Sequence, residues 1–184
     1  MQTRTPIRSL AGVLTVTLAG TLTLGAAGIA QAAPLPDACA LLKSAEVEDL
    51  MDRPLRLQGG KPMQYGTGEY VTVMSNCGIH DADAPSRAVP PVSLVVNDRE
   101  ASAPQERDEE WLEEHGRQMA NGNTLEPIDL GPEQGLYFEL GQSQSLYILL
   151  RGGQSDAQIS ARPAFMSKEQ LIELGTRLAE AAAD

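Results

Sequence analysis

The residues that could do metal or acid–base chemistry gather around one cysteine. Cys77 and His80 have a Cys-x-x-His spacing, and Asp81 and Asp83 follow directly. A structural zinc site needs four nitrogen or sulfur ligands, and this segment supplies one half of such a set. Asp81 and Asp83 also lack the third Asp or Asn, the Gly and the distal Glu of a calcium-binding loop. We therefore expect no bound cofactor, and a metal-binding protein that uses His80, Asp81 and Asp83 is an alternative.

Nucleophilic catalysis needs a Ser or Cys beside a base and an orienting acid. The second histidine, His115, falls on the apolar stripe of a predicted helix, where packing is the expected role. No Gly-x-Ser-x-Gly elbow is present. Gly59-Gly60-Lys61 lacks the remaining spacing of a phosphate-binding loop. A pair of carboxylates that meets only in the fold is compatible with the sequence, so a hydrolase is the main alternative to a binding function.

The first thirty residues have the pattern of an export signal. Two arginines precede an uncharged run from Ser9 to Ala30, and Ala30-Gln31-Ala32 has the small residues that a signal peptidase accepts. We predict a signal peptide over residues 1–32 and a single domain over residues 33–184, exported to the periplasm or the cell exterior. An uncleaved anchor helix is the alternative, because the run is nearly long enough to span a bilayer.

The chain contains two cysteines, Cys39 and Cys77. In an exported protein, such a pair most often forms one structural disulfide. A metal site that uses Cys77 and a redox couple are the alternatives, although a redox dithiol normally has its two cysteines close in sequence. We predict the Cys39–Cys77 disulfide.

The charge balance narrows the kinds of partner. The formal net charge is −11, and loss of a signal peptide that contains two arginines would make it more negative. Phosphate contacts need clustered Lys and Arg, so we expect no nucleic-acid partner and no stable insertion into a membrane after signal cleavage. The acidity favours a basic or neutral partner surface.

The helices and strands that would position the candidate residues can be predicted from helix-capping residues and from the spacing of apolar residues. Asp37 and Ser44 are candidate caps of a first helical region that ends near Met51. Ser102 and Gln105 form a capping box that starts a helix over residues 102–120, and Ser167 with Gln170 starts a last helix. Before the second helix, strands are expected over residues 55–58, 70–79 and 92–97.

Residues 125–162 form the centre of the predicted fold. Their short apolar runs, separated by Gly, Gln and Ser clusters, are typical of an antiparallel meander. The run from Leu146 to Leu150 contains no charged or amide side chain, so both of its faces should be covered, by the 102–120 helix and the last helix. We predict an α+β fold with a single antiparallel sheet of about six strands and helices on both faces.

Several short motifs, spread over nearly the whole predicted domain, resemble those of a group of known proteins. They are Asp37-Ala38-Cys39-Ala40-Leu41-Leu42, Glu46-Val47, the isolated Cys77, Leu130-Gly131 and Tyr137. With the order of elements, they resemble exported bacterial proteins of unknown function, many of them actinobacterial envelope lipoproteins, which share a PsbP-like α/β/α sandwich. The resemblance implies that fold and carries over no catalytic residue. This chain departs by lacking a Leu-x-x-Cys lipobox before Cys39 and by having Gly78 where the group often has an aromatic residue.

The expected function is that of a non-catalytic exported domain that binds a protein or a cell-envelope component. Polar Gly- and Pro-containing loops on a rigid sheet often carry recognition, so the 59–68 connection and the 81–91 loop are the expected contact regions. Tyr65 is the candidate aromatic anchor, and packing over the sheet edge is the alternative role for its ring. His80, Asp81 and Asp83 are the other candidate binding residues.

Overall fold

The computed structural model describes residues 35–183 apart from Pro36, residues 67–70, Ser86 and residues 100–107. The predicted signal peptide with its cleavage site and the Ser102–Gln105 capping box lie outside the described residues. Among those that are described, no helix is long and apolar enough to cross a membrane.

Two short helices open the described chain. The Asp37 carboxylate accepts a hydrogen bond from the Ala40 N–H at 2.9 Å and caps α1 (Ala38–Ser44), as predicted. Glu46 then adopts a left-handed conformation with φ of 52°, and α2 (Val47–Met51) follows. Ser44 was predicted to cap this second part, and that prediction is wrong. Its hydroxyl donates to the Ala40 carbonyl oxygen inside α1 instead, because α1 already includes it.

One antiparallel sheet of eight strands forms the framework, which confirms the predicted α+β class. The strands are β1 (Leu55–Gly59), β2 (Met63–Tyr65), β3 (Thr72–Asp81), β4 (Val92–Arg99), β5 (Glu126–Asp129), β6 (Gln134–Leu140), β7 (Ser143–Leu150) and β8 (Ser155–Ala161). The strand count exceeds the predicted six partly because β2 has three residues, too few to show a hydrophobic period.

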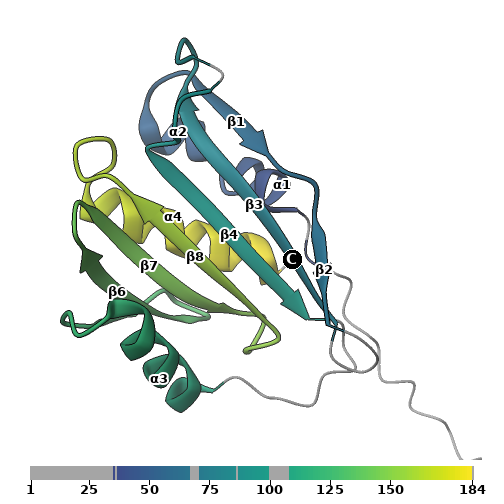
Figure 1. Cartoon of the computed structure of the whole chain (residues 1–184), viewed down its shortest axis with the longest axis vertical. Helices are drawn as coiled ribbons and strands as arrows, with labels where there is room; N and C mark the ends of the chain where they lie inside the picture. Colours follow the sequence, from purple (N-terminus) through teal and green to yellow (C-terminus); the bar gives the residue numbers. More distant parts are fainter. Residues whose placement is uncertain (1–34, 36, 67–70, 86, 100–107, 184) are drawn as a thin grey trace, which may run out of the picture. The chain divides into compact units, whose positions relative to one another are not determined.

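The last strand joins the two halves of the sheet. The spatial order is β1-β3-β4-β8-β7-β6-β5, and β2 also pairs with β3 (Figure 1). β8 therefore lies between β4 and β7, with Ile159 opposite both Leu94 and Leu146. These three side chains are fully buried, so the hydrophobic core is centred where the halves meet.

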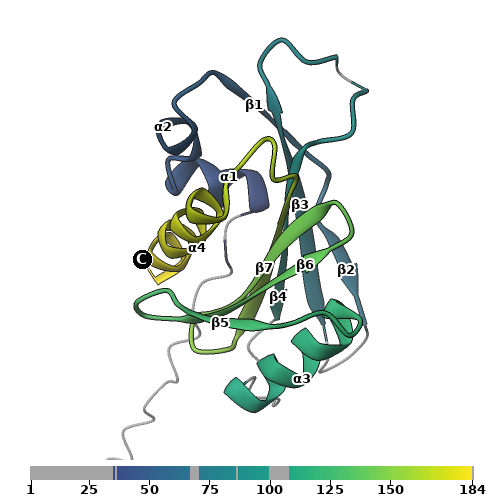
Figure 2. The same cartoon turned by 90° about the vertical axis from the view of Figure 1, so that its left-hand side faces the viewer.

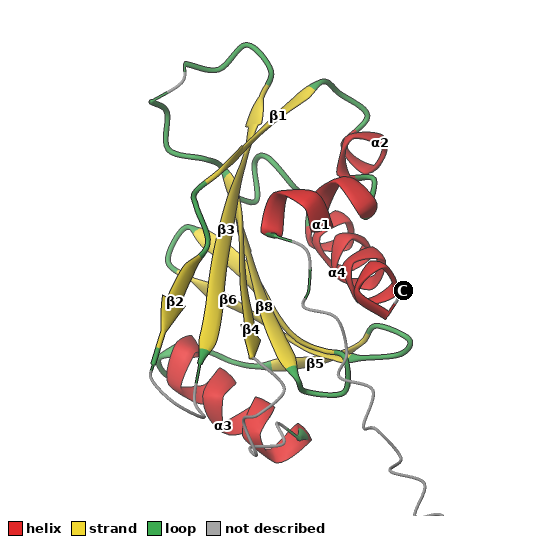
Figure 3. Cartoon of the chain, turned by 90° about the vertical axis from the view of Figure 1, so that its right-hand side faces the viewer, coloured by secondary structure: helices red, strands yellow, loops and turns green. Residues whose placement is uncertain are grey.

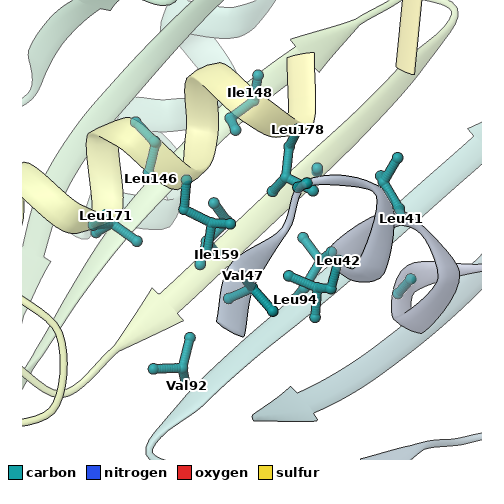
Figure 4. Close-up of a cluster of buried hydrophobic side chains, with 14 of the residues drawn as sticks. Leu41, Leu42, Val47, Val92, Leu94, Leu146, Ile148, Ile159, Leu171 and Leu178 are labelled. Atoms are coloured by element: carbon teal, nitrogen blue, oxygen red, sulfur yellow. The ribbon is translucent and has the colours of Figure 1, made fainter. Parts of the chain in front are cut away.

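The larger hydrophobic cluster joins the sheet to α1, α2 and α4 (Lys168–Ala183). Leu146, Ile148 and Leu150 of β7 are fully buried in it, as predicted. Figure 4 shows Leu171 and Leu178 of α4 near Leu146, Ile148 and Ile159. The predicted capping box of α4 is present, since the Ser167 and Gln170 side chains each accept a hydrogen bond from the other's backbone N–H.

A second cluster lies under α3 (Glu109–Ala120). It contains Tyr147 and Leu149, which alternate along β7 with the three residues of the larger cluster and therefore point to the opposite side of the strand. α3 packs against β6, and α4 packs mainly against β7 (Figure 2). The predicted 102–120 helix is not continuous through residue 108: Asp108 is extended, and its carboxylate accepts from the Trp111 N–H at 2.9 Å as the N-cap of α3.

Glycines let α3 and α4 approach the sheet closely. A Cβ atom built on Gly116 of α3 would lie 2.5 Å from Leu136 Cδ1. One built on Gly175 of α4 would meet Leu146 Cδ2, again closer than carbon atoms pack. Both helices therefore contact the sheet through backbone, at positions where any larger residue must displace a leucine side chain.

Gly175→Val is expected to lower the free energy of unfolding by about 1–3 kcal/mol, because its methyl groups would overpack the contact with Leu146. Urea denaturation followed by circular dichroism measures the change. Thr176→Val is the matched control, since it places valine at the next, half-buried position of the same helix. An equal loss of stability in both variants would show that the close approach of Gly175 is unimportant.

Candidate functional site

One edge of the sheet is built from β1 and β2, which pair with successive parts of β3 (Figure 3). The two strands are separated by residues 60–62, where the ladder is interrupted. Within the described part of the chain, β1 and β2 pair with β3 alone. Their outer sides therefore present backbone N–H and C=O groups that can pair with another chain.

β2 exposes every one of its residues. Met63 is 46% exposed and Tyr65 is 48% exposed, and both are large side chains with apolar surface. They are two residues apart on a strand, so they project from the same face, and the Tyr65 hydroxyl lies 4.0 Å from Met63 Sδ. The candidate anchor Tyr65 is thus accessible at the sheet edge.

The other candidate binding residues lie at the far end of β3. Tyr65 pairs with Thr72 and Arg56 pairs with His80, so the two ends are about 26 Å apart at the usual rise of a strand. The structure therefore does not bring Tyr65 together with His80, Asp81 and Asp83.

His80 belongs to β3 and not to the loop after it, and its side chain is 2% exposed. Its Nδ1 atom has no hydrogen-bond partner within the described residues. The Asp81 carboxylate is 3.4 Å from the Arg53 guanidinium, and Asp83 is exposed in the following turn. In the part of the chain that the structure describes, no three His, Cys, Asp or Glu side chains are grouped so that they could hold a metal ion.

Cys39 and Cys77 form the predicted disulfide, with Cα atoms 5.1 Å apart, so neither sulfur is a free thiolate ligand. The bond ties α1 to β3 directly under the edge strand. A Cβ atom built on Gly59 of β1 would lie 2.9 Å from Cys39 Sγ, so β1 passes over the disulfide with only backbone between them. The Ala38 N–H also donates to Ser75 Oγ of β3 at 3.0 Å. These contacts fix α1 beside the sheet edge.

A hollow of about 590 Å³ lies beside β1, between that strand and the first two helices. Its lining consists of Leu55, Arg56 and Leu57 of β1 together with Lys43, Glu46, Val47, Glu48 and Asp49. We call it the β1 groove. Glu48 and Asp49 stand in the first turn of α2, where the positive end of the helix dipole favours carboxylates. The groove therefore combines an edge strand, three aliphatic side chains and three carboxylates.

A second hollow, of about 450 Å³, is bordered by α4. It shares Glu46 with the β1 groove, and Glu173, Arg177 and Glu180 contribute its remaining charged groups. Arg177 is bound within it, because its Nε lies 2.9 Å from a Glu173 carboxylate oxygen. The lining of this second hollow is therefore mainly polar.

A buried carboxylate on the α3 side of the sheet was not anticipated from the sequence. Asp156 is 1% exposed, and it accepts hydrogen bonds from the Tyr147 hydroxyl at 2.7 Å and from Asn97 Nδ2 at 2.8 Å. The His115 ring lies 5.1 Å from the Tyr147 ring and stacks on Trp111 at 4.6 Å. His115 therefore has the packing role expected for it. The alternation of polar and apolar residues along β8 could have indicated that Asp156 and Ala157 lie on opposite faces of the strand. That alternation does not reveal which side chains form hydrogen bonds with Asp156.

Tyr137 is the residue whose ionisation the fold changes most clearly. Burial, followed by the hydrogen bond from its hydroxyl to the Glu139 carboxylate, raises the pKa of Tyr137 to about 12. The phenol therefore stays neutral at physiological pH. It also lies 3.2 Å from Gln144 Oε1, whose amide nitrogen donates to the Met166 carbonyl oxygen, so this group ties β6 and β7 to the chain before α4.

No protein-family model, curated protein or solved structure matches this chain.

Proposed function

We propose that this protein works by contact and not by turnover, as an exported domain that binds a protein or a cell-envelope component. The observation that carries the proposal is the accessible edge at β2, where Met63 and Tyr65 are half exposed and the backbone pairs, within the described residues, on one side only. Tyrosine combines apolar area with a hydroxyl, which suits an anchor at an interface. The net charge of −11 favours a basic or neutral partner surface.

Export and the layered architecture belong to the same proposal. A disulfide persists in oxidising compartments, so the Cys39–Cys77 bond is compatible with the periplasm or the cell exterior. We further propose that the fold is a PsbP-like sandwich, with α1, α2 and α4 on one face of the sheet and α3 on the other. The alternation of the two hydrophobic clusters along β7 supports this arrangement.

Tyr65→Ala is expected to weaken capture of the partner by about tenfold, because truncating an aromatic anchor typically costs more than 1 kcal/mol of binding free energy. The melting temperature should remain within about 1 °C of the wild-type value, since surface substitutions are usually near neutral. The immobilised protein is incubated with envelope extract, retained components are identified, and the affinity of each purified component is then measured.

Leu140→Ala is the matched control for this experiment, because Leu140 is 45% exposed on β6, away from the β2 edge. An equal loss of affinity in the two variants would place the contact elsewhere. Unchanged binding by Tyr65→Ala would show that β2 does not form the binding surface.

A hydrolase is the second candidate, and one observation favours it: Glu46, Glu48 and Asp49 line the same groove. Two carboxylates on either side of a glycosidic bond are the usual catalytic pair of glycosidases. The purified protein is incubated with cell-envelope polysaccharide, and reducing ends are counted. Turnover that is reproducible and lost in Glu48→Gln would replace the binding proposal with an enzymatic one.

A further inference from the structure

We infer that β1 accepts an additional strand, supplied by an extended segment of a partner protein that carries lysine or arginine at alternate positions. The segment would occupy the β1 groove. This inference rests on the proposed binding function and adds the kind of partner that the site fits.

The backbone of β1 is suited to strand addition. It pairs with β3 on one side and, within the described residues, with nothing on the other. β1 contains no proline, and Gln58 and Gly59 are exposed. Sheet edges are commonly shielded by proline, by a bulge or by a covering element, because an open edge pairs readily with an extended chain. An added strand would gain main-chain hydrogen bonds along β1.

The charge of the groove selects a basic segment. Glu46, Glu48 and Asp49 line it, and none of them takes part in a salt bridge among the described residues. Two basic side chains also line the groove. Lys43 belongs to α1, and the Arg56 guanidinium donates to the Pro85 carbonyl oxygen at 3.3 Å, toward the 81–91 loop. The α2 side of the groove is therefore acidic.

The shape of the groove sets the spacing of the basic residues. Leu57 of β1 packs against the larger hydrophobic cluster and is only partly buried, and it lines the groove together with Val47 of α2. Side chains of an added strand alternate between the two faces of the sheet. A lysine or arginine at every second residue would lay its apolar stem on Leu57 and place its charge near Glu48 and Asp49. The intervening residues would lie beside Arg56 and Gln58, where small polar side chains fit.

The probe is a synthetic Lys-Thr-Lys-Thr-Lys-Thr-Lys peptide with blocked ends, added to the whole purified protein with its disulfide intact. Backbone amide signals of β1 and α2 are expected to shift in nuclear magnetic resonance spectra. Glu48→Gln with Asp49→Asn should weaken peptide binding about five- to tenfold, as expected for the loss of two partly exposed charge contacts. Glu109→Gln with Glu110→Gln is the control, because these exposed carboxylates occupy the first turn of α3 and their loss changes the net charge equally.

Two methylated peptides separate strand addition from simple charge attraction. Successive N–H groups of a strand point to opposite edges, so methylating the lysine amides blocks one edge and methylating the threonine amides blocks the other. Strand addition in a single direction, antiparallel or parallel to β1, requires that one of these peptides binds and the other does not.

Equal behaviour of the two methylated peptides, equal binding of a Glu-Thr peptide of the same length, or weakened binding in the α3 control would overturn the inference. These results would leave the proposed function standing if Tyr65→Ala still reduced capture from envelope extract. Loss of the Tyr65 effect, by contrast, would remove the proposed function itself.

Discussion

Replacing both cysteines with serine, as Cys39→Ser with Cys77→Ser, is expected to lower the free energy of unfolding by about 4 kcal/mol. The two residues are 38 positions apart in sequence, and a cross-link across a loop of that length removes about this much conformational free energy from the unfolded chain. The folded domain should keep its sheet, because β3 pairs with β1, β2 and β4 independently of the disulfide. The loss should therefore be one of stability and not of fold.

Guanidinium denaturation of the oxidised protein, the reduced protein and the double serine variant measures this effect. The reduced protein and the serine variant should unfold at nearly the same denaturant concentration, since both lack the cross-link. The α1 segment should exchange its amide hydrogens faster in both, because the disulfide and the hydrogen bond to Ser75 hold it on β3. A variant as stable as the oxidised protein would show that the disulfide contributes nothing to folding.

Ile148→Ala is expected to lower the free energy of unfolding by about 2–5 kcal/mol, the range for truncating a fully buried aliphatic side chain. Ile148 has no exposed surface and lies in the larger cluster, opposite Ala157 of β8 and near the close contact of Gly175 with the sheet. The small neighbours Ala157 and Gly175 leave little side-chain volume that could move into the space, so the cavity should persist.

The control for Ile148→Ala is Val95→Ala, which shortens an aliphatic residue at a half-buried position of β4. Val95→Ala should lower the free energy of unfolding by about 1 kcal/mol or less, because folding removes less apolar surface from water at this half-buried position. Thermal and urea unfolding of the two variants give the comparison. Similar losses in both would mean that the core relaxes around position 148, contrary to the packing described above.

The candidate site could be predicted from the sequence only in its separate parts. The 59–68 connection with Tyr65 was expected to be accessible from its Gly and Pro content, and Tyr65 is indeed half exposed. No functional role was predicted from the sequence for Glu48 and Asp49 of α2. Glu48 and Asp49 line a groove with β1 because of where α1 and α2 lie, and the disulfide ties α1 to β3. A local sequence pattern contains no information on that placement.

His80 shows where a local reading fails. The strand expected over residues 70–79 left His80 outside it, because the following stretch is rich in Asp, Ala and Pro, which is typical of loops. Pairing with Arg56 of β1 extends β3 through His80 and buries the ring. The partner strand is 24 residues earlier in the chain, so the extra two residues of β3 follow from tertiary pairing and not from the propensity of the segment.

The sequence by itself determined those features that depend on neighbouring residues or on simple counting. The burial of Leu146, Ile148 and Leu150 follows from an uninterrupted apolar run, the α4 cap from Ser167 and Gln170, and the disulfide from two cysteines in a chain with an export pattern. Each is decided by local sterics, by hydrogen bonding within one turn, or by the chemistry of a single pair.

Only the tertiary structure decided which strands meet and which side chains face one another. It placed β8 against β4, and thereby set Asp156 beside Asn97, 59 residues away in the chain. Among the residues that the structure describes, it also left β1 and β2 paired on one side only, with β3. Strand order depends on the free energy of the whole packed sheet, summed over residues far apart in sequence, whereas a local pattern fixes only which face of each strand is apolar.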